Sequence, residues 1–171
     1  MALHVPRVEC VLGLTWPEID ETEPTLEGNA LLKARSVAAY TGLPALADDT
    51  GLEVDALDGG PGVRTARFAG ERATYGENVA LLLAKLEGLT DRRASFHTVA
   101  ALVIPGGEES VAEGTLVGRI ATTPRGSEGF GYDAVFEASG RTLAELGADE
   151  KNRVSHRARA LKALIASVWG P

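Results

Sequence analysis

Two clusters of charged residues have the types and spacing that suit chemistry on a phosphoanhydride. The first is a consecutive acidic pair, Asp48 and Asp49, which follows a short apolar stretch, residues 43–47. Adjacent carboxylates repel each other, so folded proteins place such a pair where a cation or a proton offsets the repulsion. The second cluster is basic and lies near the C-terminus, at Lys151, Ser155, His156 and Arg157. Acids for a metal and bases for a phosphate together indicate cleavage of a phosphoanhydride.

The acidic pair favours a magnesium site. Mg²⁺ is usually held by one or two carboxylates together with substrate phosphates. We expect the pair at the end of a buried strand, where α/β proteins place their ligand clefts. Glu27, in the first turn of the preceding helix, is a further candidate ligand. An aspartate of the pair can also act as general base toward an attacking water. A solvated turn is the alternative interpretation, because Asp shortly before Gly is common turn chemistry.

The basic cluster is predicted to open a C-terminal helix, with Ser155 as its N-cap. His156 and Arg157 then lie in the first turn, where free N–H groups and the helix dipole favour an anion or a carbonyl oxygen. Basic side chains at that end oppose the dipole, so their placement favours a functional role over an ordinary surface charge run. Lys151 and Lys33 stay open between a substrate contact and a solvated lysine.

A glycine-rich loop, residues 126–133, carries two aromatic side chains and ends on a carboxylate. Phe130 and Tyr132, on either side of Gly131, can stack on a nucleobase, with Asp133 near a ring N–H. Aromatics that fill the edge of a core are the equally good alternative.

The composition argues against a nucleic-acid surface. The 171 residues include 17 basic and 24 acidic side chains, a net charge of −7, so the cation excess that nucleic-acid phosphates require is absent. The single cysteine, Cys10, suits a reducing compartment. No run approaches the ~18 apolar residues of a membrane span, and no signal-peptide pattern opens the chain. We expect a cytoplasmic protein with neither membrane nor nucleic acid as partner.

Helical and strand patterns alternate along the chain. Apolar periodicity and capping residues predict helices at 25–40, 74–88 and 155–168 and a short helix from the capping box at 142–145. Strands are predicted at 8–14, 43–47, 95–104, 111–120 and 135–136. This order predicts one α/β domain over residues 1–171 with a mixed sheet.

Six segments together resemble the inosine triphosphate pyrophosphatase family. They follow one another in the family's order, at residues 25–34, 47–52, 60–63, 65–70, 129–133 and 150–157. The resemblance implies a long mixed sheet between two lobes around a cleft, a homodimer, and Mg²⁺-dependent hydrolysis of ITP, dITP and XTP to the monophosphate and pyrophosphate. Hydrogen-bond donors near the purine 6-position would favour an oxo group over the 6-amino group of adenine.

The resemblance also assigns roles to individual residues. Asp49 becomes the general base and a metal ligand, with Asp48 and Glu27 as the other metal ligands. The substrate-binding residues are Lys33, Thr50, Phe130, Gly131, Tyr132, Asp133, Lys151, His156 and Arg157.

Two departures from the family pattern accompany the resemblance. The family normally opens with a strand and a Thr/Ser-x-Asn-x-x-Lys phosphate loop, and we expect this sequence to begin after that segment. Gly28 stands where the family often has an acid. The alternatives are therefore a nucleotide-binding or dimer-forming remnant of the family without catalysis, and a pyrophosphatase for modified pyrimidines.

Overall fold

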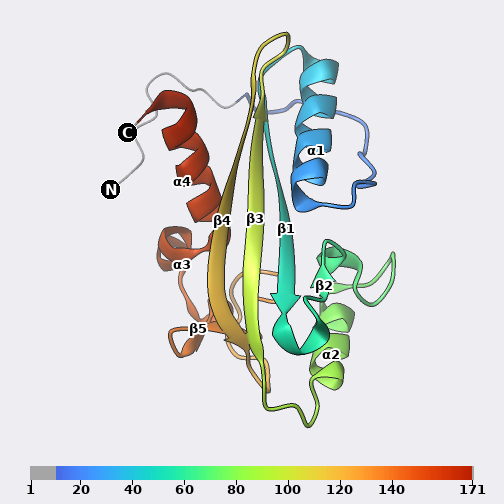
Figure 1. The fold of residues 1–171 in the computed structure, drawn as a ribbon, viewed down its shortest axis with the longest axis vertical. Coiled ribbons are helices and arrows are strands. Elements are labelled where there is room, and N and C mark those ends of the chain that lie inside the picture. Colours follow the sequence, from blue (N-terminus) through green and yellow to red (C-terminus); the bar gives the residue numbers. More distant parts are fainter. Residues whose placement is uncertain (1–10, 171) are drawn as a thin grey trace.

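One long sheet runs the length of the molecule and carries helices on both faces (Figure 1). The computed structural model describes residues 11–170. Its strands lie in the order β2-β1-β3-β4-β5-β6. In chain order the elements are α1 (Leu26–Thr41), β1 (Ala45–Val54), β2 (Pro61–Gly62), α2 (Tyr75–Lys85), β3 (Arg93–Val103), β4 (Glu109–Ile120), β5 (Phe136–Ala138), β6 (Arg141–Thr142), α3 (Ala148–Val154) and α4 (His156–Trp169).

Capping residues set the ends of the helices as the sequence predicts. The Thr25 hydroxyl accepts the Gly28 N–H at 3.0 Å and opens α1. Gly42 ends it in the left-handed conformation, with φ of 70°, which costs a residue without Cβ least. Thr74 and Glu77 form the predicted capping box of α2. The predicted helices over 25–40, 74–88 and 155–168 are confirmed within a few residues at their ends.

Alternate residues of the central strands face opposite sides of the sheet. On one side, Val99 of β3 packs with Ala34 of α1. On the other side, Ala100 of β3 packs with Leu164 of α4. The two helices therefore cover opposite faces of the same half of the sheet, as Figure 1 shows.

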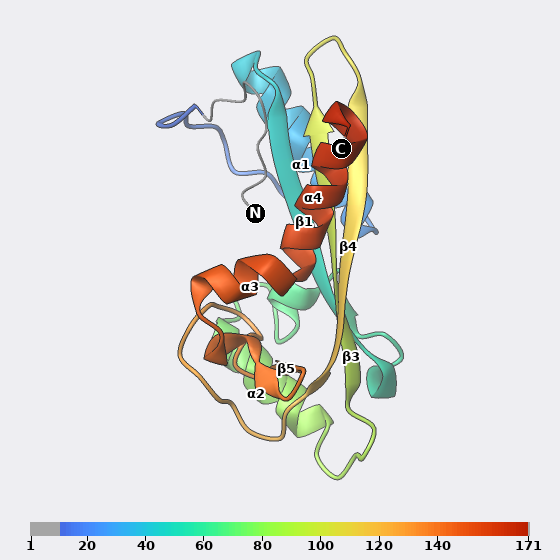
Figure 2. The ribbon, with the colours of Figure 1, turned by 90° about the vertical axis from the view of Figure 1, so that its left-hand side faces the viewer.

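A second lobe covers only the α4 face at the other end of the strands. Its core joins Leu52 of β1 and Phe96 of β3 to Leu82 of α2 and Phe136 of β5. The Phe96 and Phe136 ring centroids lie 4.6 Å apart. Figure 2 shows α2 and β5 at this end, with α3 and α4 leading back toward the first half. The predicted α/β architecture of two lobes around a cleft is confirmed.

Two features of the sheet correct the predictions. Every strand pair within residues 11–170 is antiparallel, where a mixed sheet was expected. Each strand that follows another without an intervening helix runs in the opposite direction to it. The segment that contains α2 also brings β3 beside β1 in the opposite direction. Secondly, β1 does not end at the acidic pair but continues to Val54, because residues 48–54 pair with residues 94–100 of β3.

Two further expectations have mixed outcomes. Of the strand expected at 8–14, residues 8–10 lie outside the described part of the chain and residues 11–14 form no strand. The capping box of Thr142 and Glu145 is present, but it opens only the 3-10 turn Leu143–Glu145. Between residues 11 and 170 no helix combines the length and apolar character needed to cross a membrane.

Candidate active site

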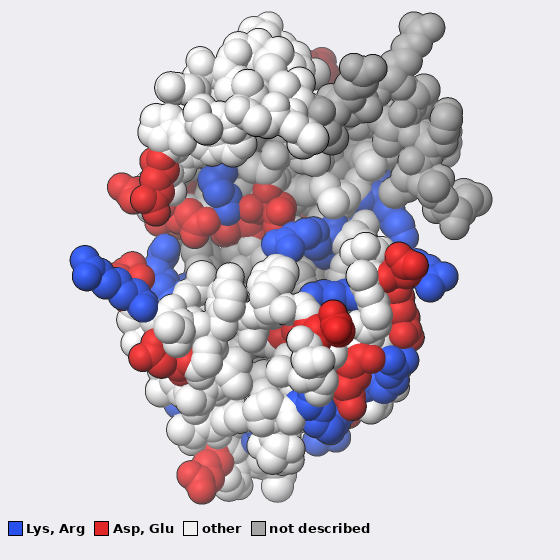
Figure 3. Space-filling model, turned by 180° about the vertical axis from the view of Figure 1, so that it is seen from behind, with Lys and Arg blue, Asp and Glu red and all other residues white. Residues whose placement is uncertain are grey.

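A cleft of about 670 Å³ lies on the α4 face between the two lobes, a size typical of small-molecule sites. Figure 3 shows a hollow across this side of the molecule, with acidic side chains along one part of it and basic side chains along the next. All the sequence-predicted site residues except Glu27 line this cleft, namely Lys33, Asp48, Asp49, Thr50, Phe130, Gly131, Tyr132, Asp133, Lys151, His156 and Arg157.

The acidic pair reaches the cleft from both faces of one strand. Asp48 and Asp49 are adjacent residues of β1, so their side chains point to opposite sides of the sheet. β2 pairs with β1 only at Leu52 and Glu53. At the acidic pair, therefore, the described residues pair β1 along one edge only, through β3. Both carboxylates can border the same cleft because it lies beside that open edge.

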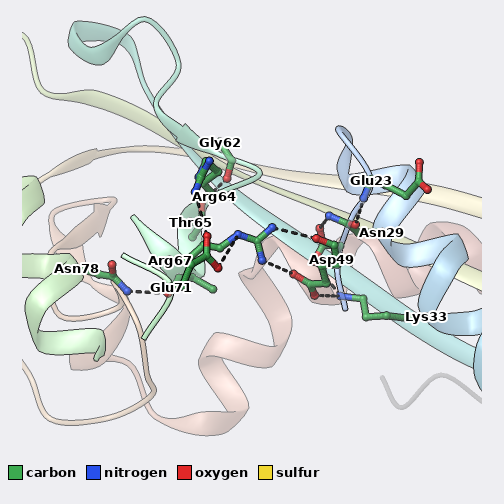
Figure 4. Close-up of polar contacts among 12 residues, drawn as sticks. Glu23, Asn29, Lys33, Asp49, Gly62, Arg64, Thr65, Arg67, Glu71 and Asn78 are labelled. Atoms are coloured by element: carbon green, nitrogen blue, oxygen red, sulfur yellow. Dashed lines mark hydrogen bonds and ion pairs between the residues drawn. The ribbon is translucent and has the colours of Figure 1, made fainter. Parts of the chain in front are cut away.

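Asp49 is the buried acid of the pair, with 8% of its surface exposed. Lys33 Nζ donates to Asp49 Oδ1 at 2.8 Å, and Asn29 Nδ2 donates to Asp49 Oδ2 at 3.3 Å. Figure 4 shows both side chains extending toward Asp49. Burial raises the pKa of Asp49 above its ordinary value, and the opposing effects of Lys33 do not reverse this shift. Asp49 therefore has the properties of a carboxylate that accepts a proton.

Glu21 is an acidic residue of this site that the sequence did not reveal. Lys33 Nζ donates to Glu21 Oε1 at 2.8 Å, so one ammonium group joins Glu21 to Asp49. Burial would lower the pKa of Lys33, but the hydrogen bonds to Asp49 and Glu21 outweigh it and the pKa is raised. Arg67 holds Glu21 from the other side, donating from Nη2 to the Glu21 carbonyl at 3.2 Å.

Glu27 does not occupy the place predicted for it. Its side chain is exposed on the first turn of α1, and it is not among the residues that line the cleft. Helical geometry explains the difference, because Asn29 and Lys33 are four residues apart and share the face that meets Asp49, whereas Glu27 lies on another side of the helix.

Asp48 belongs to a different set of contacts. Arg157 Nε donates to Asp48 Oδ2 at 2.9 Å, and the Thr50 hydroxyl reaches the same oxygen at 3.4 Å. Thr50 Oγ1 lies 2.7 Å from Thr98 Oγ1, and Thr98 Oγ1 lies 2.6 Å from His156 Nδ1. A continuous polar chain thus runs from the acidic pair to the start of α4.

His156 is a buried, neutral base at the start of α4. It is 7% exposed, and its ring stacks on Phe96 at a centroid distance of 4.5 Å and an angle of 26°. Burial is the main reason that the pKa of His156 falls to about 3, and the positive charges of Arg157 and Lys151 add to the effect. The imidazole therefore carries no charge at neutral pH.

The glycine loop supplies an exposed aromatic ring bordered by cations. Phe130 is 55% exposed, Lys151 Nζ lies 5.1 Å from its ring centroid and Arg157 Cζ 5.7 Å. The Tyr75 ring, at 6.0 Å and tilted by 38°, extends this surface. The exposed Phe130 ring is therefore free to stack on a planar group, and its role as the surface for a nucleobase stays a prediction.

Asp133 and Tyr132 have structural partners. Asp133 forms an ion pair with Lys151 and accepts the Phe130 N–H at 2.8 Å, so it fixes the shape of the loop. A side chain at Gly129, whose φ is 79°, would collide with the Asp133 carboxylate. Tyr132 is 4% exposed and its hydroxyl donates to the Thr65 carbonyl at 3.0 Å. Tyr132 thus contributes one edge of the cleft while most of its ring fills the core.

Sequence reasoning missed Asn29 and Thr98 as well as Glu21. A usable signal existed for two of them. Asn29 lies one helical turn before Lys33 on the same face of α1, and Thr98 is a hydroxyl residue inside the most apolar strand of the chain. Nothing in the segment around Glu21 distinguishes that acid from its neighbours.

Known proteins match almost the whole of the chain. The profile described as the Ham1 family matches residues 3–167. A dITP/XTP pyrophosphatase of Elusimicrobium minutum is 54% identical over 153 residues, which are 87% of this chain and 78% of that protein. The one from Rhodospirillum centenum is 46% identical over 171 residues, covering 97% and 84%.

Solved structures show the same fold. The Ham1 protein of Staphylococcus aureus superposes with a TM-score of 0.83 at 41% identity, covering 90% of this chain and 81% of that one. A structure from Mycobacterium abscessus named as a nucleoside-triphosphatase / dITP/XTP pyrophosphatase gives 0.71 at 49% identity, covering 88% and 79%.

Proposed function

The chain belongs to the Ham1 family, and on that premise we propose that it hydrolyses the non-standard purine nucleoside triphosphates ITP, dITP and XTP to the monophosphate and pyrophosphate. The observation that carries the proposal is an ion pair that joins the two ends of the cleft. Arg157, beside the aromatic ring of Phe130, donates to Asp48, the neighbour of Asp49. A nucleotide that lies along the cleft would meet a stacking surface at one end and carboxylates at the other.

At the acidic end, Asp49 acts as general base. It takes a proton from water as the water oxygen attacks the α-phosphorus, and the bond from that phosphorus to the bridging oxygen of the β-phosphate breaks. The products are the nucleoside monophosphate and pyrophosphate. Lys33, which contacts Asp49 and Glu21 at 2.8 Å each, brings positive charge to the phosphates and orients the carboxylate.

The donors at this end fit a divalent cation such as Mg²⁺. No group of three or more potential ligands able to hold a metal alone occurs within residues 11–170, but Mg²⁺ needs only one or two carboxylates when phosphates and water complete its shell. Asp49 and Asp48 line the cleft and Glu21 shares Lys33 with Asp49, so we assign the metal to these three residues and no longer to Glu27. When bound, the cation would neutralise phosphate charge.

At the basic end, the purine stacks on Phe130, and Arg157 and Lys151 provide donors for a 6-oxo group. An adenine would place its own 6-amino donor against these cations and leave hydrogen bonds unmade. Thr50 and the Gly131–Asp133 segment complete the walls of this part of the cleft.

Pyrophosphate release from ITP, dITP, XTP, GTP and ATP with Mg²⁺ tests the proposal on the 171-residue chain. We expect fast release from ITP, dITP and XTP and slow release from ATP. Binding of ITP without release, measured by calorimetry, would identify the chain as a nucleotide-binding remnant. Release from modified pyrimidine nucleotides alone would place the substrate in the other class.

The resemblance implies a homodimer and the composition of the sequence predicts a cytoplasmic protein, and we retain both as proposals. The single cysteine in the sequence agrees with a reducing compartment. Light scattering coupled to size exclusion gives the mass directly, and a monomer at micromolar concentration would contradict the proposed dimer.

A further inference from the structure

The buried hydroxyl of Thr98 lies at the centre of the polar chain that joins the acidic pair to His156. Thr98 is fully buried, and among residues 11–170 its Oγ1 has two hydrogen-bond partners, the Thr50 hydroxyl on one side and His156 Nδ1 on the other. A hydroxyl has one proton to donate, so the direction of donation along this chain decides which imidazole nitrogen of His156 carries the proton.

The acidic end of the chain sets that direction. Asp48 Oδ2 accepts the hydrogen bond from Arg157 Nε at 2.9 Å, so it acts as an acceptor toward the Thr50 hydroxyl too, which donates its proton to the same oxygen at 3.4 Å. Thr50 Oγ1 then accepts from Thr98, and Thr98 Oγ1 accepts from His156 Nδ1. The proton of the neutral ring is thereby placed on Nδ1, which leaves a lone pair on Nε2.

The lone pair on Nε2 is available to a ligand. Within residues 11–170 no side-chain nitrogen or oxygen is both buried and without a hydrogen-bond partner. The hydrogen bond between His156 and Thr98 involves Nδ1, and Nε2 has no partner among the described residues. Nε2 is therefore not a buried atom, and it is accessible from the cleft that His156 lines.

We propose that Thr98 is a positioning residue that fixes the Nδ1–H tautomer of His156, so that Nε2 accepts a hydrogen bond from the N1–H of a 6-oxopurine. This inference rests on the proposed function and deepens it. A 6-oxopurine carries a proton on N1, whereas N1 of adenine carries a lone pair. His156 Nε2 and adenine N1 would then face each other as two acceptors.

The acceptor on His156 complements the donors beside it. Arg157 can donate to O6 while His156 accepts from N1–H, a pair that matches inosine and xanthine and opposes adenine at both positions. Guanine has the same two groups, so this pair selects 6-oxopurines as a class.

The tautomer can be measured without any substrate. The chain contains three histidines, so long-range proton–nitrogen correlation spectra of ¹⁵N-labelled protein at neutral pH resolve their ring nitrogens, and His156→Gln identifies the signals of His156. We expect a protonated Nδ1 and an unprotonated Nε2. A proton on Nε2, or on both nitrogens, would overturn the proposal whether or not the protein hydrolyses ITP.

Variants of Thr98 connect the tautomer to selectivity. Thr98→Val keeps the shape of the side chain and removes the acceptor for Nδ1–H, so we expect the proton on Nε2 and a fall of about tenfold or more in the ITP-to-ATP ratio of kcat/KM. Thr98→Ser should restore both properties. Thr115→Val is the matched control, because Thr115 Oγ1 lies 3.1 Å from Nδ1 of a different histidine, His97 of β3. This variant should change neither the tautomer of His156 nor the selectivity.

The outcomes separate the two proposals. Wild-type protein that hydrolyses ITP, together with a Thr98→Val variant of unchanged tautomer and selectivity, overturns the role of Thr98 and leaves the function intact. Wild-type protein without activity refutes the function, and the spectrum still decides the tautomer. If Thr98→Val does not fold, the wild-type spectrum and Thr98→Ser decide, since a serine that moves the proton to Nε2 contradicts the proposal.

Discussion

The two ends of the cleft use opposite electrostatics. At the end formed by α1 and β1, two carboxylates, Glu21 and Asp49, share the one ammonium group of Lys33. At the end formed by the glycine loop and α4, two cations, Lys151 and Arg157, border the exposed ring of Phe130. The first arrangement suits a metal ion and an attacking water, and the second suits a base with an oxo group.

The contrast shows how adjacent residues acquire separate roles. Asp48 and Asp49 are neighbours in the chain, yet β-strand alternation directs Asp49 to Lys33 and Asp48 to Arg157. We therefore expect changes around Asp49 to alter the rate of hydrolysis and changes around Arg157 and His156 to alter the choice of base. Variants at each end can break or sharpen this division.

The largest effect is expected from Asp49→Asn. Loss of a general base lowers turnover by about two to four orders of magnitude, measured as kcat for pyrophosphate release from ITP. Near-wild-type kcat would remove Asp49 from catalysis.

A stability measurement on the same variant excludes unfolding as the cause. Because burial raises the pKa of Asp49, the folded state binds a proton more readily than the unfolded state does, and the ionised carboxylate costs stability at neutral pH. The unfolding free energy of Asp49→Asn should therefore not fall below that of the wild type.

Next in size is the effect of Glu21→Gln. Loss of a carboxylate that helps to hold a metal ion or orients its ligands typically lowers affinity or activity by about 10–100-fold. We expect this loss in kcat, together with a higher Mg²⁺ requirement in a metal titration. Glu27→Gln is the matched control, because Glu27 is an exposed acid six residues along the chain. An equal loss in the two variants would contradict the assignment of Glu21 over Glu27.

Glu21 and Glu27 also show how far the site could be predicted from the sequence. Motif order and capping residues were sufficient to predict the helices and the central hairpin. Of the twelve site residues predicted, eleven line the cleft, and Glu27 does not. Glu21 lies in a loop without periodicity, so only the fold brings it to Lys33. Asp48 and Asp49 were expected to act together at the end of a strand. Their side chains instead point to opposite faces of the sheet, because β1 continues beyond them and stays paired with β3.

A smaller effect, on selectivity, is expected at the basic end. Arg157→Ala removes a charged donor for the 6-oxo group, a bond of about 1.5–3 kcal/mol, so the ITP-to-ATP ratio of kcat/KM should fall by about tenfold or more. Arg159→Ala is the control, since Arg159 is exposed and donates to the Thr115 carbonyl at 2.6 Å. If Arg157→Ala lowers kcat on ITP and ATP equally, the division between the two ends is wrong.

The smallest effect is a pH dependence of stability that His156 introduces. In the unfolded chain its imidazole takes up a proton near its ordinary pKa of 6.5, whereas in the folded protein burial lowers the pKa to about 3. Between these values the unfolded state binds more protons, so the stability that His156 confers is complete above pH 6.5 and is lost as the pH falls toward 3. The slope is at most ~1.4 kcal/mol per pH unit.

Urea unfolding of wild type and His156→Gln between pH 7.5 and 5 measures this dependence. The advantage of the wild type should shrink as the pH falls, because glutamine does not titrate. Asp49 shifts in the opposite sense, since burial raises its pKa and favours its neutral form. Both shifts have the same cause, because burial disfavours charge on a base and on an acid alike. A difference between wild type and His156→Gln that stays constant with pH would mean that the pKa of His156 is the same in the folded and unfolded states. The buried ring would then take up a proton near pH 6.5, and the contrast between a neutral ring and its cationic neighbours would be lost.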